Sequence, residues 1–373
     1  MTGTGKRIVW IVMLMLVILW GLAACGGNQN NPSESTEGTS APVTASPTPT
    51  PSPTLTPTPT PDLHEGEKRS YLTGEWIPEE EAEQRPYAVI LNNLKTASPQ
   101  SGIGEADILY EALTEGGITR FLGIYEDIGT DRLGSVRSAR HYFVTFADEY
   151  DAIFIHFGKT SYATRKMNEL GIDHVDGTGG SGASTFYRDN SIPAPHNAFT
   201  GLEQIEETVQ RLGFRTSYEE DFEGHFLFRE EAGQTDEKEG AVTADKVTLG
   251  FSGYISPYFE YSSEDSLYYR FQFGEAHIDY NTKEQLAFRN LIIQFVREWD
   301  IDQNGYQTME LEDASGEGYY ITDGISVPIT WKKAGTAGIT RYYDTDGKEI
   351  ELNPGKTYIA VFPDSRMDKA VIE

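Results

Sequence analysis

The sequence predicts an α+β protein, with an N-terminal α/β layered domain over residues 85–215 and a mostly antiparallel β-rich domain over residues 246–373. In the first region, β-branched and aromatic runs alternate with segments whose apolar residues recur at helical spacing. In the second region nearly every apolar run is strand-like. The pairs Asn304-Gly305 and Asp346-Gly347 there favour hairpin turns, because such turns require positive φ angles.

The elements of the first region can be assigned in order along the chain. Its predicted strands cover residues 87–93, 106–113, 118–127 and 151–158. The Gly116-Gly117 pair favours a hairpin between the second strand and the third. Its predicted helices cover residues 139–150, 161–170 and 201–212. Ser138 is the expected N-cap of the first helix, while Gly171 and Gly213 end the other two.

The second region is predicted to contain strands and few helices. These strands cover residues 268–274, 291–296, 318–331, 340–352 and 357–363. Between the two regions, residues 216–245 are strongly acidic, which is typical of a linker or a solvated surface excursion.

The first residues have the features of a secretory signal. Lys6 and Arg7 precede the apolar run Ile8–Leu22, which is shorter than the roughly 20 residues that span a membrane comfortably. The following Leu22-Ala23-Ala24-Cys25 resembles a bacterial lipobox. That resemblance implies a lipoprotein signal peptide over residues 1–24, a lipid on the Cys25 thiol, and attachment to the extracytoplasmic face of the cell membrane through that lipid.

Residues 25–84 are predicted to form a Pro/Thr-rich disordered tether, because alternating Pro and Thr favours an extended chain with little apolar surface to bury. Cys25 is the only cysteine, so a disulfide within the chain is excluded. The formal net charge of −28 excludes nucleic acid as the main partner.

The stretch from Arg132 to Phe143, "RLGSVRSARHYF", concentrates positive charge in this acidic chain. An arginine fork suits carboxylate or phosphate, and a helix start adds free N–H groups. The candidate ligand-binding residues are Arg120, Arg137, Ser138, Arg140, His156, His196 and Asn197. The alternative is that the arginines are structural struts paired with nearby carboxylates, namely Glu111, Glu115, Glu126 and Asp127. Arg140 and His141 project about 100° apart on a helix, so Arg140 is the expected strut.

A catalytic interpretation centres on His196, which lies in a loop stiffened by Pro193 and Pro195. It would act as general acid or base, with Glu111 or Glu115 as second carboxylate. His156 lies in an apolar strand, where histidine is more often a core residue than a catalyst.

No metal or cofactor is predicted from the sequence. The histidines form no metal-binding spacing, and Asp300–Leu311 lacks the final Glu of a calcium loop. The motif Gly177–Gly182 matches a nucleotide fingerprint, but no helix is expected to open there directly from a strand, so it is interpreted as a glycine-rich loop.

Several long motifs resemble the YerB-like bacterial lipoproteins, a family with a two-part domain of unknown function. The resemblance covers roughly residues 85–365 and includes "RPYAVILNN", "GSVRSARHYF", "EYDAIFIHFG", "APHNAFT", "HIDYNTKEQL" and "IELNPGKTYIAV". It implies a surface lipoprotein and carries over no catalytic residue.

Three functional classes follow from these observations. The preferred hypothesis is a cell-envelope binding or assembly factor that recognises an anionic group, such as a peptidoglycan carboxylate or the phosphate of an anionic cell-wall polymer. The second is an envelope hydrolase or transferase. The third is a protein-interaction module whose β-rich domain docks a membrane protein.

Overall fold

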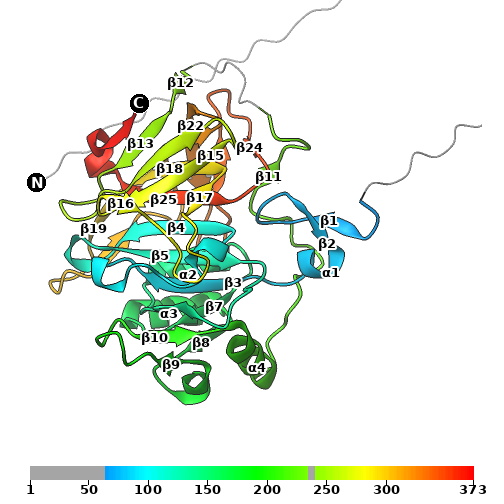
Figure 1. Ribbon diagram of the computed structural model, residues 1–373, viewed down its shortest axis with the longest axis vertical. Coiled ribbons are helices and arrows are strands. Elements are labelled where there is room, and N and C mark those ends of the chain that lie inside the picture. Colours follow the sequence, from blue (N-terminus) through cyan, green and yellow to red (C-terminus); the bar gives the residue numbers. More distant parts are fainter. Residues whose placement is uncertain (1–63, 234–239) are drawn as a thin grey trace, which may run out of the picture. The chain divides into compact units, whose positions relative to one another are not determined.

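The computed structural model describes residues 64–233 and 240–373, which form few helices and many strands (Figure 1). The α-helices of these residues are α1 (Glu79–Ala82), α2 (His141–Asp148), α3 (Ser161–Leu170) and α4 (Leu202–Leu212). The predicted signal peptide, Cys25 and residues 26–63 of the predicted tether lie outside the described residues. Within the described part of the chain, no helix is long and apolar enough to cross a membrane.

An 11-stranded mixed sheet runs through the described structure. Its strands, in spatial order, are β12 (Val242–Thr243), β22 (Ile325–Lys333), β21 (Ala314–Thr322), β18 (Asn290–Val296), β25 (Thr357–Pro363), β4 (Ile108–Leu113), β5 (Thr119–Tyr125), β3 (Tyr87–Asn92), β7 (Ile153–His156) and β8 (His174–Asp176), with β23 (Arg341–Tyr343) beside β22. Figure 1 shows the middle strands of this order following one another from β18 to β8.

The two predicted regions share this sheet instead of forming separate sheets. β25 pairs in parallel with β4, with Thr357 opposite Ile108 and Val361 opposite Ala112. β4 would otherwise be an unpaired edge on the side away from β5, and an apolar strand edge is stabilised by pairing. The α+β class is confirmed, with antiparallel pairing in the majority, but the β-rich region is built onto the first region's sheet.

Alternate residues of β4 explain why its sequence is apolar apart from Glu111. Ile108 and Tyr110 belong to one buried cluster, and Leu109 and Leu113 belong to another. Because successive strand residues point to opposite faces, the strand is buried on both sides. On the first face α2 covers the sheet, and the ring of Phe146 stacks on Tyr110 with centroids 4.8 Å apart.

A second sheet covers the other face. Its strands are β16 (Glu275–Ala276), β15 (Leu267–Gln272), β14 (Tyr258–Ser262), β13 (Lys246–Leu249) and β26 (Ala370–Ile372), with β17 (Ala287–Phe288) beside β15. Phe259 of β14 contacts Tyr358 of β25 with ring centroids 4.7 Å apart. This sheet therefore packs directly on the strand that joins the two regions.

Short strands complete the fold. They are β1 (Glu67–Arg69), β2 (Trp76–Pro78), β6 (Leu133–Gly134), β9 (Tyr187–Arg188), β10 (Ala198–Thr200), β11 (Leu227–Phe228), β19 (Glu298–Asp300), β20 (Gln307–Met309) and β24 (Glu351–Leu352). β1 and β2 form a hairpin that precedes α1, so ordered structure begins well before the expected boundary at residue 85.

Much of the acidic segment 216–245 is also part of the fold. β11 pairs with β24, and β12 pairs with β22. His225 is only 1% exposed. The described part of this segment is therefore packed against the molecule, because its apolar and aromatic residues alternate with the acidic ones that dominate its composition.

The predicted helix ends are largely confirmed. α3 begins after Thr160, whose side chain accepts a hydrogen bond from the Ala163 amide, and it ends at Gly171 with φ 71°. Ser138 as N-cap is wrong, since α2 begins at His141 and Arg140 occupies the cap position. The amide of Ala139 donates to the carbonyl of Gly158 at 2.9 Å, which keeps this segment extended beside β7.

One predicted strand is wrong in detail, and one predicted turn is confirmed. The run 318–331 contains two strands, β21 and β22, joined at Asp323 (φ 53°) and Gly324 (φ 75°). This is a two-residue hairpin of the kind that needs positive φ at both positions. In the Asn304-Gly305 hairpin, which joins β19 to β20, Gly305 has φ 74°, and the calcium-loop match is a turn as expected.

Candidate functional site

The ends of three parallel strands define the edge at which the candidate residues gather. β3 pairs in parallel with β7, and β7 with β8. Their C-terminal residues are Asn92, His156 and Asp176. The carboxyl edge of parallel strands is the common ligand-binding place in α/β sheets. We refer to this place as the carboxyl edge.

The segment before α2 is threaded between the ends of β3 and β7. The amide of Arg137 donates to the carbonyl of Ile90, and the amide of Phe157 donates to the carbonyl of Arg137, both at 2.9 Å. These backbone bonds fix Arg137 at the carboxyl edge, although the sequence alone gave it only a loop position.

Arg120 lies at the start of β5 and is 6% exposed. Its Nη1 donates to the carbonyl of Ser138 at 2.7 Å. Among the described residues no carboxylate forms an ion pair with Arg120. Burial, followed by the charges of Arg140 and Arg137, lowers the pKa of Arg120 to about 9. The side chain remains a cation at neutral pH and is a buried positive charge without a direct counter-ion.

Arg137 and Arg188 lie close enough to influence each other. Arg137 Nη1 donates to the carbonyl of Pro195 at 2.7 Å, and Arg188 Nη1 donates to Asn197 Oδ1 at 2.7 Å. Burial, Arg140 and then Arg188 lower the pKa of Arg137. Within the described chain, neither Arg137 nor Arg188 forms an ion pair with a carboxylate.

His196 lies beside these arginines. Its Nδ1 is 2.9 Å from Asn92 Nδ2 at the end of β3. Burial and the charge of Arg137 lower the pKa of His196, so the ring is neutral at pH 7. With the amide of Asn92 donating to Nδ1, the neutral ring carries its proton on Nε2 and is a hydrogen-bond donor there. We call Arg120, Arg137, Arg188 and His196 the basic cluster.

Arg140 is a structural strut, as the sequence predicts. Its Nε and Nη2 bind the two carboxylate oxygens of Glu115 at 2.7 and 2.6 Å. Burial raises the pKa of Glu115, but the hydrogen bonds and charge of Arg140 outweigh it, and the net change is downward. Glu115 is therefore an ionised, committed partner of Arg140.

Glu111 is also committed elsewhere, since it is completely buried. Arg270 Nη2 and the Tyr358 hydroxyl donate to its Oε2, each at 2.7 Å. Asn93 Nδ2 and the Thr119 hydroxyl donate to its Oε1 at 2.9 and 2.7 Å. Both candidate carboxylates are thus held by other partners, and neither forms a hydrogen bond or ion pair with His196 among the described residues.

His156 is buried, as the sequence indicates, but it has a partner that the sequence did not reveal. Its Nδ1 donates to the carbonyl of Gly158 at 2.9 Å, and its Nε2 lies 3.1 Å from Nδ1 of His174 in β8. Burial lowers the pKa of His156 to about 4. The motif Gly177–Gly182 follows β8 directly, contrary to the expectation, and leads into the 3-10 helix η4 (Gly180–Thr185).

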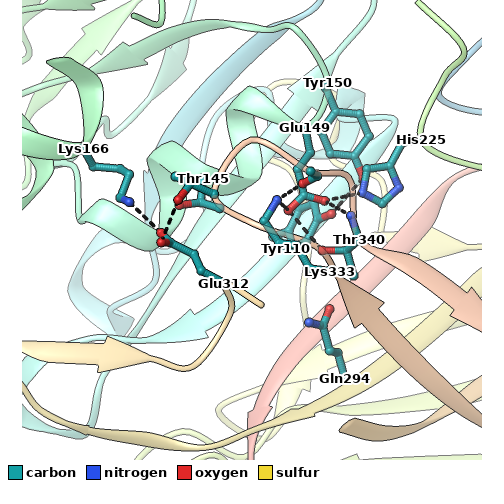
Figure 2. Close-up of polar contacts among 12 residues, drawn as sticks. Tyr110, Thr145, Glu149, Tyr150, Lys166, His225, Gln294, Glu312, Lys333 and Thr340 are labelled. Carbon is teal, nitrogen blue, oxygen red and sulfur yellow. Dashed lines mark hydrogen bonds and ion pairs between the residues drawn. The ribbon is translucent and has the colours of Figure 1, made fainter. Parts of the chain in front are cut away.

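A second buried polar network lies at the far end of α2 (Figure 2). Glu149 accepts hydrogen bonds from Lys333 Nζ at 2.9 Å, His225 Nε2 at 2.8 Å and the Thr340 amide at 2.7 Å. The His225 ring stacks on Tyr150 with centroids 4.5 Å apart. Glu149 and Lys333 are at most 1% exposed, so this network joins the two regions and offers no surface to a ligand.

The sequence analysis therefore missed Asn92 and Arg188 at the carboxyl edge, and His174 as the partner of His156. Asn92 carried a usable signal, because it is a polar residue that ends a buried strand. Arg188 lies in a short strand that only the fold brings beside Arg137. Within the described residues, no group of acidic, histidine or cysteine side chains is arranged to hold a metal ion.

Comparison with known proteins places this chain in a family. A model described as "Protein of unknown function (DUF3048) N-terminal domain" matches residues 72–215, and one for the C-terminal domain matches residues 247–359. The chain belongs to this family.

One relative in this family is similar to the chain over most of its length, in sequence and in structure. The "Putative lipoprotein YerB" of Bacillus subtilis (strain 168) is 32% identical over 293 residues, which is 79% of this chain and 86% of the relative. The crystal structure of the YerB protein from Bacillus subtilis superposes with a TM-score of 0.70 at 30% identity, covering 82% of this chain and 99% of that one. The expected resemblance to the YerB-like family is confirmed.

Proposed function

We propose that the protein is a lipid-anchored binding factor of the cell envelope, and that the basic cluster holds an anionic group of an envelope polymer. The observation that carries this proposal is the set of three guanidinium groups, Arg120, Arg137 and Arg188, that form no ion pair with a carboxylate among the described residues, whereas Arg132 and Arg140 do. Clustered cations without counter-ions repel one another, and an anion at their centre relieves that repulsion.

The donors of the cluster suit an anion better than a neutral group. Arg137 and Arg188 each present a planar fork, and the neutral His196 presents an Nε2–H group. Arg120 is buried close enough to Arg137 to influence it, and it supplies charge from a desolvated position, where Coulomb interactions are stronger than in water. A phosphate or carboxylate bound here would accept hydrogen bonds from the guanidinium and imidazole N–H groups of the cluster.

A binding role is favoured over hydrolysis. A general base needs an unprotonated nitrogen aimed at the substrate, whereas the neutral His196 has its lone pair on Nδ1, beside Asn92. Glu111 and Glu115 are saturated by other partners and are not available as the second carboxylate. These contacts support a binding role over the hydrolase hypothesis.

Anchoring follows from the N-terminal sequence. We propose that Cys25 carries a diacylglycerol and that the Pro/Thr-rich residues after it hold the folded part away from the membrane. Such a tether would let the basic cluster reach anionic groups in the surrounding wall.

The experiment measures anion binding by the full-length chain in detergent. Isothermal titration with inorganic phosphate and acetate, and co-sedimentation with isolated wall polymer, are compared for the wild type and Arg137→Gln. Loss of one bidentate contact is expected to weaken binding about tenfold or more. Arg165→Gln is the matched control, because Arg165 is an exposed arginine outside the cluster. Equal binding by the wild type and Arg137→Gln, or hydrolysis products from wall material, would contradict the proposal.

A further inference from the structure

A cavity of about 590 Å³ lies along β8 and reaches the carboxyl edge at Asp176, and no part of the basic cluster lines it. Its polar wall includes Lys159, His174 and Asp176, and its apolar wall includes Ile172, Leu212 and Phe214. The volume falls within the range of small-molecule sites, and the pairing of an apolar wall with a few polar groups is typical of them.

The hydrogen-bond chain behind the cavity fixes the chemistry of His174. A carbonyl only accepts, so Nδ1 of His156 carries the proton donated to Gly158. The neutral His156 therefore has its lone pair on Nε2, which must accept the proton on His174 Nδ1, 3.1 Å away. A neutral His174 then has its lone pair on Nε2. Burial and the charge of Lys159 lower the pKa of His174, which keeps the ring neutral.

The Nε2 lone pair of His174 is available to a ligand. The half-buried His174 ring lines the cavity, and within the described chain its only side-chain hydrogen bond is the one to His156. The cavity therefore presents a defined hydrogen-bond acceptor that a donor group can approach.

Both carboxylates in the cavity wall have a cationic partner, because Asp173 pairs with Arg85 at 2.7 Å and Asp176 pairs with Lys159. Lys159 Nζ forms an ion pair with Asp176, and Asp176 Oδ1 also accepts from the amides of Gly158 and Thr178 at 3.0 and 2.9 Å. Since the carboxylate is saturated and the ammonium is neutralised, the cavity favours an uncharged ligand over the anions that suit the basic cluster.

The glycine-rich segment leaves the cavity open on one side. A Cβ built on Gly177 would lie 2.4 Å from the Phe157 ring, so that position requires glycine for packing. Gly179 differs, because a Cβ there would meet nothing within 4 Å and its φ of 173° is ordinary extended backbone. Backbone conformation and packing would therefore allow a side chain at position 179. Because Gly179 lines the cavity, a side chain there would occupy space that the glycine leaves open.

We propose that this cavity binds a neutral sugar unit of a glycan. A sugar hydroxyl supplies the donor that His174 Nε2 accepts, and the remaining ammonium protons of Lys159 can donate to a second hydroxyl. The C–H face of the sugar ring packs against Phe214 and Leu212. The sugar cavity and the basic cluster share the carboxyl edge, so one anionic glycan has complementary groups for both.

Titration of the full-length chain with two neutral disaccharides, the N-acetylglucosamine disaccharide and cellobiose, tests the proposal. Isothermal titration gives the affinity, and the imidazole nitrogen signals report on His174. His174→Asn retains a donor at the Nδ1 position and removes the Nε2 acceptor. Gly179→Leu fills the cavity from a position whose backbone accepts a side chain. Both variants are expected to keep the wild-type melting temperature and to bind at least about tenfold more weakly.

The outcomes separate this proposal from the anion site. His174→Gln restores a polar group near Nε2 and is expected to recover part of the affinity, while Arg137→Gln leaves disaccharide binding unchanged. Phosphate binding should persist in Gly179→Leu. The proposal is overturned if the wild type binds neither disaccharide at concentrations on the order of 10 mM, or if Gly179→Leu and His174→Asn bind as tightly as the wild type.

Discussion

Replacing Arg120 with methionine is expected to stabilise the fold and to weaken anion binding at the same time. Arg120 is a cation at 6% exposure that donates to the Ser138 carbonyl and forms no ion pair within the described chain. Methionine has a similar length and adapts to irregular surroundings. The substitution therefore removes a buried charge without leaving a large cavity.

The size of the effect can be estimated from the pKa. Burial and the neighbouring arginines lower the pKa of Arg120 from 12.5 to about 9, and at 1.36 kcal/mol per unit this corresponds to roughly 5 kcal/mol of unfavourable interaction with the charged form. The lost hydrogen bond from a charged donor offsets about 1.5–3 kcal/mol of this. Ser138 keeps a second donor, Arg140 Nη1 at 3.4 Å. A net gain of about 2 kcal/mol in unfolding free energy is expected for Arg120→Met.

Urea unfolding without phosphate measures the change in stability, and the additional stability gained with phosphate measures anion binding. A ligand at a hundred times its dissociation constant stabilises the native state by about 2.7 kcal/mol. The wild type should gain stability in phosphate, whereas Arg120→Met should gain much less. Arg120→Lys keeps the charge and is the control, expected to resemble the wild type in phosphate response. If Arg120→Met is less stable than the wild type by more than about 1 kcal/mol, the side chain is structural and the reasoning fails.

Three further predictions follow. Glu111→Gln breaks a fully buried pair with Arg270 and should lower the unfolding free energy by about 3–5 kcal/mol in urea titrations, while residual folded protein still binds phosphate. Burial, followed by Asp107, raises the pKa of Glu126 to about 7 although a Ser70 hydrogen bond opposes this. The protonated Glu126 then contributes stability that is fully present below about pH 4.5 and is lost as the pH rises through 7. The unfolding free energy of Glu126→Gln should therefore exceed that of the wild type at pH 8 but not at pH 4.5. Cys25→Ala should move the protein from the membrane fraction to the medium, and retention in the membrane would argue against lipid anchoring.

Local patterns in the sequence were sufficient for most individual elements. The strand at residues 87–93 and the helix closed by Gly171 are confirmed almost to the residue, because alternation, caps and glycine turns are local properties. The shared sheet was not predictable in the same way. β4 and β25 are separated by more than two hundred residues, and nothing in either strand specifies that the other is its neighbour.

The candidate site was also predictable only where it depends on local sequence. Arg137 and His196 were identified as candidates because loops and helix starts carry binding groups. Arg188 and His174 could not be included, because their roles depend on contacts between separate strands, as the 3.1 Å contact between His156 and His174 illustrates. A histidine in a strand becomes informative only when its neighbours in the sheet are known.

The distribution of carboxylates explains why the arginines of the basic cluster form no ion pair within residues 64–233 and 240–373. The sequence left open the alternative that Glu111, Glu115, Glu126 and Asp127 pair with the arginines of this region. In the folded protein Glu111 pairs with Arg270, and Glu149 with Lys333, so two acids of the first region neutralise bases of the second. These pairs join the two regions in the buried interior. Because Glu111 is committed there and Glu115 is bound to Arg140, neither forms an ion pair with Arg120 or Arg137 in the described chain, which supports the proposed anion site.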